Sequence, residues 1–336
     1  MTLHTPPSPM LTREIGSSGI RASAIGLGTW AIGGWMWGGT DEAAAIEGIR
    51  ASLDAGVTLI DTAPAYGLGR SEEIVGAAIA GRRDEVVLAT KCGLVWHTDK
   101  GRRFFDEDGK PVHRYLGTDS IRHELEQSLR RLRTDHIDLY ITHWQDPTTP
   151  IAETLGALEA LKREGKIRAI GASNLSRPDL EAYLAAGTLD AIQEQYSMVH
   201  RDIEADLLPL CVANNVSVLS YSSLTLGLLT GKIGPDRTFN GDDLRINDPR
   251  FTVANREKVA AFAKEIAPVA AAHDATVAEI VIAWTLAQPG ITFSLCGARN
   301  VQQARENARA GALHLAAHEM DAMTAAAGRH LTDIHV

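Results

Sequence analysis

The sequence predicts an α/β fold, a (β/α)8 TIM barrel, in one chain of 336 residues. The first observation is an alternation of short β-rich runs with longer amphipathic segments, which is typical of a parallel sheet joined by crossover helices. The second is the count of eight such runs, because eight β/α units favour a closed barrel over an open sheet. The third is the length, since barrel domains of this size form one unit.

The expected strands and helices alternate from the first barrel strand onward. The strands cover residues 23–27, 57–61, 85–91, 136–142, 167–172, 191–195, 216–221 and 292–296. The helices between them repeat apolar residues at helical spacing and include residues 41–55, 71–80, 118–133, 150–164 and 177–186.

The N-terminal part is expected to hold a tail and a hairpin. Residues 1–10 are rich in Pro, Ser and Thr and predict a flexible tail without the apolar core of a signal peptide. Residues 11–15 and 20–22 flank a Gly-Ser-Ser-Gly turn and predict an N-terminal β-hairpin that closes the barrel floor. Residues 11–336 are then a single barrel domain.

Composition narrows the class of function. A net charge of -9 disfavours sequence-independent binding to nucleic acid and binding to an anionic membrane. No run of 18 apolar residues is present, so no membrane span is expected. The cysteines Cys92, Cys211 and Cys296 are odd in number and widely spaced, which predicts neither a disulfide framework nor a metal site. A reducing cytoplasm is the expected compartment.

Three connections are too long for ordinary loops of a barrel. They cover residues 33–40, 92–117 and 222–253, and each follows the C-terminal end of an expected strand. Barrel enzymes carry their active sites at this end of the strands. The long loops at the C-terminal face are therefore expected to surround the site.

Chemically active residues also gather at that end. Asp61 ends the second expected strand, Lys91 ends the third, and His143 follows the fourth, while Tyr66 lies five residues after Asp61. Each residue taken alone has a plain alternative, since Asp61 suits a helix cap, Lys91 a surface ion pair, and Tyr66 and His143 ordinary packing. Taken together, they predict a catalytic group of an acid, a cation, a phenol and an imidazole.

The segments that carry these residues resemble the aldo-keto reductase superfamily. The signature segments are VTLIDTAPAYGLGRSEE at 57–73, ATK ending at Lys91, LYITHW with His143, and LKREGKIRAIGASN at 161–174. The resemblance runs from about residue 11 to 315 and is closest to the bacterial branch with GTWAIGGW after the first strand. It implies a TIM-barrel enzyme that reduces small aldehydes or ketones to alcohols with NADPH.

The residues themselves support carbonyl reduction, which needs a hydride for carbon and a proton for oxygen. Tyr66 is the expected proton donor, but a free phenol has a pKa of about 10. We expect Lys91 to lower that pKa and Asp61 to hold Lys91 as a cation. His143 is expected to donate a hydrogen bond to the substrate oxygen and so orient the carbonyl.

The cofactor site is expected at the loops after the last two strands, where barrels bind phosphate. The sequence has no GxGxxG motif near its start, so a Rossmann cofactor site is not expected. The resemblance implies that Tyr221 stacks on nicotinamide, that Ser173, Asn174 and Gln195 bind its carboxamide, and that Arg299 binds the 2′-phosphate of NADPH. The other expected cofactor contacts are Gly28, Thr29, Trp30, Asp61, Ser222, Ser223, Leu224, Gly227, Leu228, Gly231, Lys232, Gly297, Ala298, Gln303 and Asn307.

A small, partly apolar carbonyl compound is the expected substrate, because tryptophans follow the first and fourth strands. The residues expected to face it are Trp30, Trp37, Tyr66, His143 and Trp144. A monomer is expected, since the sequence has no heptad repeat that would form a coiled coil with a partner. Two other classes remain open: a barrel aldolase in which Lys91 forms a Schiff base, and a nonenzymatic NADPH-sensing subunit of the same fold.

Overall fold

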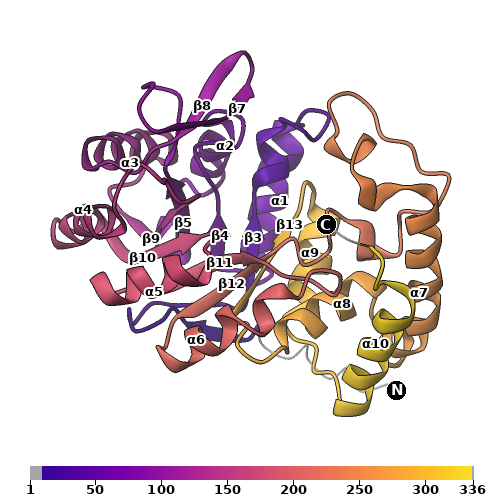
Figure 1. Ribbon diagram of the computed structural model, residues 1–336. Coiled ribbons are helices and arrows are strands. Elements are labelled where there is room, and N and C mark those ends of the chain that lie inside the picture. Colours follow the sequence, from indigo (N-terminus) through magenta and orange to yellow (C-terminus); the bar gives the residue numbers. More distant parts are fainter. Residues whose placement is uncertain (1–9, 335–336) are drawn as a thin grey trace.

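The computed structural model describes residues 10–334, and the expected tail lies outside these residues except for Met10. Eight parallel strands close a barrel in the order β10-β11-β12-β13-β3-β4-β5-β9, which confirms the predicted fold (Figure 1). Their bounds are β3 (Ile25–Gly28), β4 (Leu59–Asp61), β5 (Val87–Cys92), β9 (Ile137–Thr142), β10 (Ile167–Ser173), β11 (Ala191–Gln195), β12 (Ser217–Tyr221) and β13 (Phe293–Gly297).

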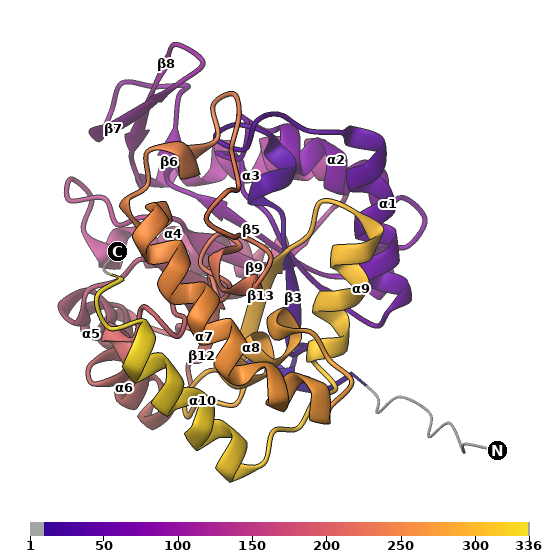
Figure 2. The same cartoon turned by 90° about the vertical axis from the view of Figure 1, so that its right-hand side faces the viewer.

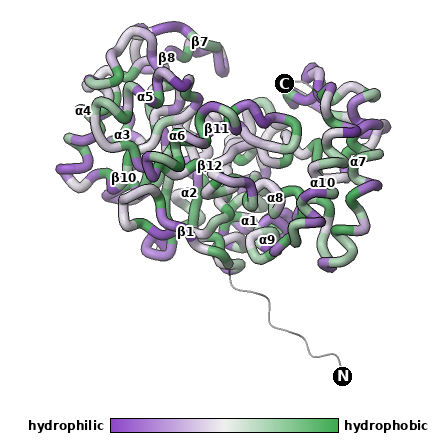
Figure 3. Tube along the Cα trace, turned by 60° about the horizontal axis from the view of Figure 1, so that its bottom comes forward, coloured by the Kyte–Doolittle hydropathy of each residue, from purple (hydrophilic) through white to green (hydrophobic). Residues whose placement is uncertain are grey.

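Helices surround the barrel (Figures 1 and 2). Their bounds are α1 (Glu42–Asp54), α2 (Arg70–Ala78), α3 (Thr118–Leu132), α4 (Ile151–Arg163), α5 (Arg177–Ala186), α6 (Leu207–Ala213), α7 (Val253–Ala272), α8 (Val277–Leu286), α9 (Val301–Ala310) and α10 (Ala317–His330). The Asp41 carboxylate caps α1 by accepting from Ala44 N, and a capping box of Thr276 and Glu279 starts α8. Hydrophilic and hydrophobic stretches alternate along the outer helices (Figure 3).

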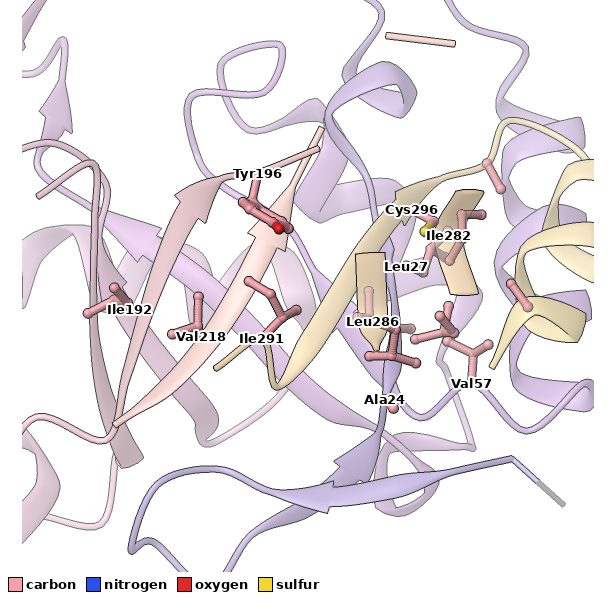
Figure 4. Packing of buried hydrophobic residues seen from close by; sticks show 14 of the residues in the cluster. Ala24, Leu27, Val57, Ile192, Tyr196, Val218, Ile282, Leu286, Ile291 and Cys296 are labelled. Carbon is pink, nitrogen blue, oxygen red and sulfur yellow. The ribbon is translucent and has the colours of Figure 1, made fainter. Parts of the chain in front are cut away.

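Two apolar layers follow from the alternation of side chains along each strand. Leu59, Ala89 and Leu139 belong to the layer inside the barrel, together with residues of the other strands. The larger layer lies between the strands and the helices and includes Ile192 and Val218 (Figure 4). The apolar residues of the strands are therefore used in these two layers, and polar residues remain at the strand ends.

The predicted hairpin is present at the N-terminus. It pairs β1 (Thr12–Glu14) with β2 (Arg21–Ser23) in antiparallel register. Ile15, Ile20 and Ala22 are buried in the same cluster as the interior residues of the barrel strands. The hairpin thus closes the barrel floor, as the sequence predicted.

The connection 92–117 is not the irregular loop that its length suggested. It folds as an antiparallel sheet of β6 (Leu94–Val95), β7 (Arg102–Glu107) and β8 (Lys110–Arg114), which we call the flap, residues 94–114. Asp108 and Gly109 turn the chain with φ of 48° and 72°, the type I′ geometry that an Asp-Gly pair favours. Figure 2 shows the flap at the same end of the molecule as the long loop after β12.

Within residues 10–334, no single helix is long and apolar enough to cross a membrane. Only α7 and α8 taken together reach that length and composition, and they meet at 84°.

Candidate active site

A cavity of about 690 Å³ opens at the C-terminal ends of the barrel strands. Its wall includes strand ends, the loop after β3, the flap, the loop after β12 and helix α9. This volume lies within the usual range for sites that bind small molecules or cofactors. The long connections therefore surround one continuous cavity, as their positions in the sequence predicted.

Asp61, Tyr66 and Lys91 meet at this cavity. Lys91 Nζ donates to Asp61 Oδ1 at 2.7 Å, to the Thr62 carbonyl oxygen at 2.9 Å and to the Tyr66 hydroxyl at 3.1 Å. The Lys91 side chain is fully buried and lies behind Asp61 and Tyr66, whereas Asp61 and Tyr66 reach the wall. The ends of β4 and β5 fix the positions of Asp61 and Lys91, because the two strands pair in parallel.

The charge of Lys91 is set by two opposing effects. Burial lowers its pKa, but attraction to Asp61 and Tyr66 outweighs burial and raises the pKa overall. Lys91 is therefore a cation at neutral pH. A Schiff-base lysine must be neutral when it attacks a carbonyl, so this environment does not suit the aldolase mechanism.

The sequence analysis expected a lowered pKa for the Tyr66 phenol, but its pKa is raised. Burial raises the pKa, Lys91 lowers it and Asp61 raises it, and the net direction is upward. The expected lowering by Lys91 is present, but burial is the larger effect. Tyr66 is therefore a protonated donor at neutral pH, and Lys91 is placed to stabilise the phenolate that forms when the proton leaves.

His143 lies beside Tyr66, with ring centroids 5.7 Å apart and the planes almost perpendicular. Burial, and then the charge of Lys91, hold the pKa of His143 well below its usual range. The imidazole is neutral at neutral pH and offers one N–H as a donor. This arrangement suits hydrogen bonding to a carbonyl oxygen, with Tyr66 as the proton donor.

Further polar side chains lie near His143 at the ends of β10, β11 and β12. Tyr221 donates to Asn174 Oδ1 at 2.7 Å, and Asn174 Nδ2 donates to the carbonyl oxygen of His143 at 2.8 Å. Ser173 Oγ donates to the carbonyl oxygen of Gln193. The expected nicotinamide contacts Ser173, Asn174 and Tyr221 therefore lie together on the cavity wall.

Gln193, and not the expected Gln195, lines the cavity on strand β11. Its Nε2 donates to Asp61 Oδ2 at 2.8 Å, and it lines the cavity. Gln195 does not line the cavity, because it ends β11 where the chain turns away toward the Ser197–His200 bridge. The parallel register pairs Gln193 with the expected Ser173, and this register brings Gln193 to the cavity wall.

Most of the expected cofactor residues line the cavity. They are Gly28, Thr29, Trp30, Asp61, Ser173, Asn174, Tyr221, Ser222, Ser223, Leu224, Gly227, Lys232, Gly297, Arg299, Gln303 and Asn307. Besides Gln195, Leu228, Gly231 and Ala298 do not. Leu228 and Ala298 point into the outer apolar layer, and a side chain on Gly231 would meet Val277.

Four cationic side chains also line the cavity. They are Lys232, Arg237, Arg245 and Arg299, and the Arg299 guanidinium donates to the carbonyl oxygens of Trp37 and Gly39. Arginine, lysine and glycine N–H groups are the donors that phosphate oxygens prefer. The donor set therefore fits the phosphates of a dinucleotide. The sequence analysis expected the loop 222–253 at the site but missed Arg237 and Arg245, because the sequence alone does not indicate which of the loop's side chains face the cavity.

Two of these cations pair with carboxylates, Arg245 with Asp243 and Lys232 with Glu306. Lys232 Nζ donates to both carboxylate oxygens of Glu306, at 2.8 and 2.6 Å. Glu306 also lines the cavity but was not among the expected contacts. It lies between Gln303 and Asn307 on α9, and i, i+3 spacing from Gln303 was a usable signal.

The end beside Tyr66 and His143 has aromatic walls. All five expected substrate-facing residues, Trp30, Trp37, Tyr66, His143 and Trp144, line the cavity. The flap adds Phe105, whose ring stacks on Trp35 with centroids 5.3 Å apart. The walls leave room for a compact, partly apolar compound.

Comparison with known proteins defines the class. The sequence profile of the Aldo/keto reductase family matches residues 24–327. The chain belongs to the aldo/keto reductase family, whose members are enzymes that act on small carbonyl compounds with a nicotinamide cofactor.

Individual relatives cover nearly the whole chain. The aldo-keto reductase YhdN of Bacillus subtilis is 47% identical over 293 residues, 86% of this chain and 85% of that protein. The NADH-specific methylglyoxal reductase of Escherichia coli is 43% identical over 302 residues, 88% of this chain and 92% of that protein. The structure of glycerol dehydrogenase AKR11B4 from Gluconobacter oxydans superposes with a TM-score of 0.86 at 41% identity and covers 96% of each chain.

Proposed function

We propose that this protein reduces small aldehydes or ketones to alcohols with NADPH, and that Tyr66 donates the proton. The observation that carries the proposal is the contact of Lys91 Nζ with both Asp61 and the Tyr66 hydroxyl, at the edge of a cavity shared with His143. The bound nicotinamide supplies the hydride. A methylglyoxal reductase and a glycerol dehydrogenase among the relatives support substrates of about three carbons.

The roles of the four residues follow from their protonation states. His143 donates its neutral N–H to the substrate oxygen and holds the carbonyl beside Tyr66. As negative charge grows on that oxygen, the O–H bond of Tyr66 breaks and its proton forms the alcohol. Lys91 stabilises the phenolate left behind, and Asp61 keeps Lys91 charged. Solvent then returns a proton to Tyr66.

For the cofactor we propose that Ser173, Asn174 and Gln193 bind the carboxamide and that Tyr221 stacks on the ring. Arg299 binds the 2′-phosphate, which supports NADPH over NADH, since a guanidinium forms forked, charge-assisted bonds with phosphate. Glu306 opposes this preference, because an acidic side chain suits a free ribose hydroxyl. Its charge is matched by Lys232, whereas Arg299 donates to neutral carbonyl oxygens, so the charge of Arg299 favours the phosphate.

The cavity of a single chain contains all the proposed contacts, so we propose that the protein acts as a monomer. The three cysteines are buried free thiols, which supports a reducing cytoplasm as the place of action.

Steady-state oxidation of NADPH and NADH by the purified protein, with a panel of aldehydes, ketones and sugars, tests the proposed function. We expect turnover with short aldehydes and a lower KM for NADPH than for NADH. Binding of NADPH without turnover on any carbonyl would instead indicate a cofactor-sensing subunit. Inactivation by borohydride that requires substrate and no cofactor would indicate a Schiff base at Lys91.

A further inference from the structure

Glu194 is a buried acidic residue on the outer face of strand β11. The residue before it, Gln193, lines the cavity, whereas Ile192, on the same face as Glu194, belongs to the apolar layer between the strands and the helices (Figure 4). Only 5% of Glu194 is exposed. A polar side chain in such a layer is unfavourable unless it makes a hydrogen bond. The carboxyl group is therefore expected to have a specific partner.

That partner is the backbone of the turn that follows β10. Glu194 Oε1 accepts a hydrogen bond from Leu175 N at 2.9 Å. One residue earlier on each segment, the carbonyl oxygen of Gln193 accepts from Asn174 N at 3.3 Å. Strand β11 thus holds two consecutive N–H groups of this turn, one with its backbone and one with the Glu194 side chain.

The turn needs this support because Asn174 has a left-handed backbone, with φ of 58°. Such a conformation is unfavourable for a residue other than glycine, and it persists where the surrounding structure holds it. The N–H of Leu175 comes next along the chain, so its bond to Glu194 fixes the direction in which the chain leaves Asn174. Leu175 is itself buried, and its N–H would be unpaired without an acceptor.

The side chain of Asn174 connects the proposed cofactor and substrate contacts. Its Oδ1 accepts from the Tyr221 hydroxyl at 2.7 Å, and its Nδ2 donates to the His143 carbonyl oxygen at 2.8 Å and to Ser173 Oγ at 3.1 Å. In the proposed function, Tyr221 stacks on the nicotinamide, and Ser173 and Asn174 bind its carboxamide. A shift of Asn174 would therefore disturb the groups that orient the nicotinamide.

We propose that Glu194 is a positioning residue: its carboxyl oxygen holds the turn 174–175 so that the Asn174 amide meets the carboxamide of the bound nicotinamide. This inference rests on the proposed function, because Glu194 has this task only if the carboxamide binds at Asn174. Glu194 does not line the cavity, so it acts on the cofactor through Asn174 alone.

The protonation state of Glu194 decides which variants are informative. Burial raises the pKa of Glu194 to about 8, although the N–H of Leu175 lowers it. The carboxyl is therefore mostly protonated at neutral pH, and a protonated carboxyl and a carboxamide have almost the same shape, each with a carbonyl oxygen that accepts from an N–H. Glu194→Gln keeps the acceptor, whereas Glu194→Leu fills a similar space without one.

The test compares the binding of NADPH with that of 2′-phospho-ADP-ribose, which lacks the nicotinamide. Isothermal titration calorimetry on the full chain gives both Kd values for the wild type and the two variants. We expect Glu194→Leu to weaken NADPH roughly threefold to tenfold, as for the loss of about one hydrogen bond, and to leave the Kd of 2′-phospho-ADP-ribose unchanged. Glu194→Gln should stay within about twofold of the wild type for both compounds.

Asp190 offers a matched control on the same pair of strands. It directly precedes β11, and its buried carboxylate accepts from Ile170 N of β10 at 2.9 Å, but neither residue lines the cavity. Asp190→Leu and Glu194→Leu each leave a buried N–H unpaired, so both should lower Tm, for Glu194→Leu by roughly 2–6 °C because leucine suits the apolar layer. Only Glu194→Leu should change the affinity for NADPH relative to that for 2′-phospho-ADP-ribose.

Three results would overturn the proposal. One is a Glu194→Leu protein that binds NADPH as the wild type does. Another is an equal loss of affinity for NADPH and 2′-phospho-ADP-ribose, which indicates a general structural role. The third is a Glu194→Gln protein as weak as Glu194→Leu, since the acceptor is then not the cause. A wild-type protein that binds NADPH no more tightly than 2′-phospho-ADP-ribose contradicts the proposed carboxamide site itself, whatever the variants do.

Discussion

The ion pair of Lys91 and Asp61 yields a prediction in which stability and activity separate. Both side chains are almost fully buried, at 0% and 4% exposure. In Lys91→Met, Asp61 keeps only the Gln193 amide as a side-chain hydrogen-bond partner. Removing one member of a buried pair typically costs about 3–5 kcal/mol, and about 2 °C of Tm is lost per kcal/mol in large domains. We therefore expect Tm to fall by roughly 5 °C or more.

Turnover should fall for a different reason. Without Lys91, the two remaining influences on the Tyr66 phenol, burial and Asp61, both raise its pKa. The rate on a good aldehyde should drop by about 10²- to 10⁴-fold, the usual contribution of general acid catalysis.

The double variant Asp61→Asn, Lys91→Met separates the two effects. It removes both charges and leaves neutral groups of similar size, so Tm should return most of the way to that of the wild type. Turnover should stay at the level of Lys91→Met. Thermal melts followed by circular dichroism and steady-state NADPH oxidation measure the two quantities. The reasoning is refuted if the double variant is no more stable than Lys91→Met, or if Lys91→Met retains more than about a tenth of kcat.

The other predictions concern the cofactor, the imidazole and the flap. Arg299→Ala should weaken NADPH at least about tenfold and hardly affect NADH in fluorescence titrations; equal losses for both would refute a 2′-phosphate contact. The pKa of His143 is held well below its usual range, so this residue should cause no step in kcat between about pH 6 and pH 8. The variant His143→Ala should lose about 10²- to 10³-fold of kcat. A step in the wild type that disappears in His143→Ala would contradict a neutral imidazole. Phe105→Ala should raise kcat/KM for bulky aromatic aldehydes. Phe104 is an exposed neighbour that does not line the cavity, so Phe104→Ala should not raise it. Equal gains in both variants would show that Phe105 does not limit substrate size.

Regular alternation made the strands and the positions of the catalytic residues predictable. Asp61 and Lys91 stand at the last levels of neighbouring parallel strands, and His143 follows a third, so their meeting follows from the barrel alone. The error at Gln195 arose because two glutamines, Gln193 and Gln195, share one face of a strand, and only the register decides between them.

The structure of the long connections was harder to predict from the sequence. The Asp108–Gly109 pair was a visible hairpin signal inside the connection 92–117, but its exposed, charged strands lack an apolar alternation that indicates a sheet. Arg245 reaches the cavity only because the loop after β12 folds back, with Leu244 N donating to the Met36 carbonyl oxygen. Such contacts depend on packing between distant loops, which a local pattern does not encode.

The most direct test of the central claim is single-turnover reduction of a short aldehyde by Tyr66→Phe with NADPH already bound, followed by the loss of NADPH absorbance. Tyr66→Phe keeps the ring and removes only the hydroxyl that Lys91 contacts. We predict that the cofactor Kd is unchanged and that the rate of NADPH oxidation falls by about 10²- to 10⁴-fold. A rate within a few-fold of the wild type would contradict the assignment of Tyr66 as proton donor.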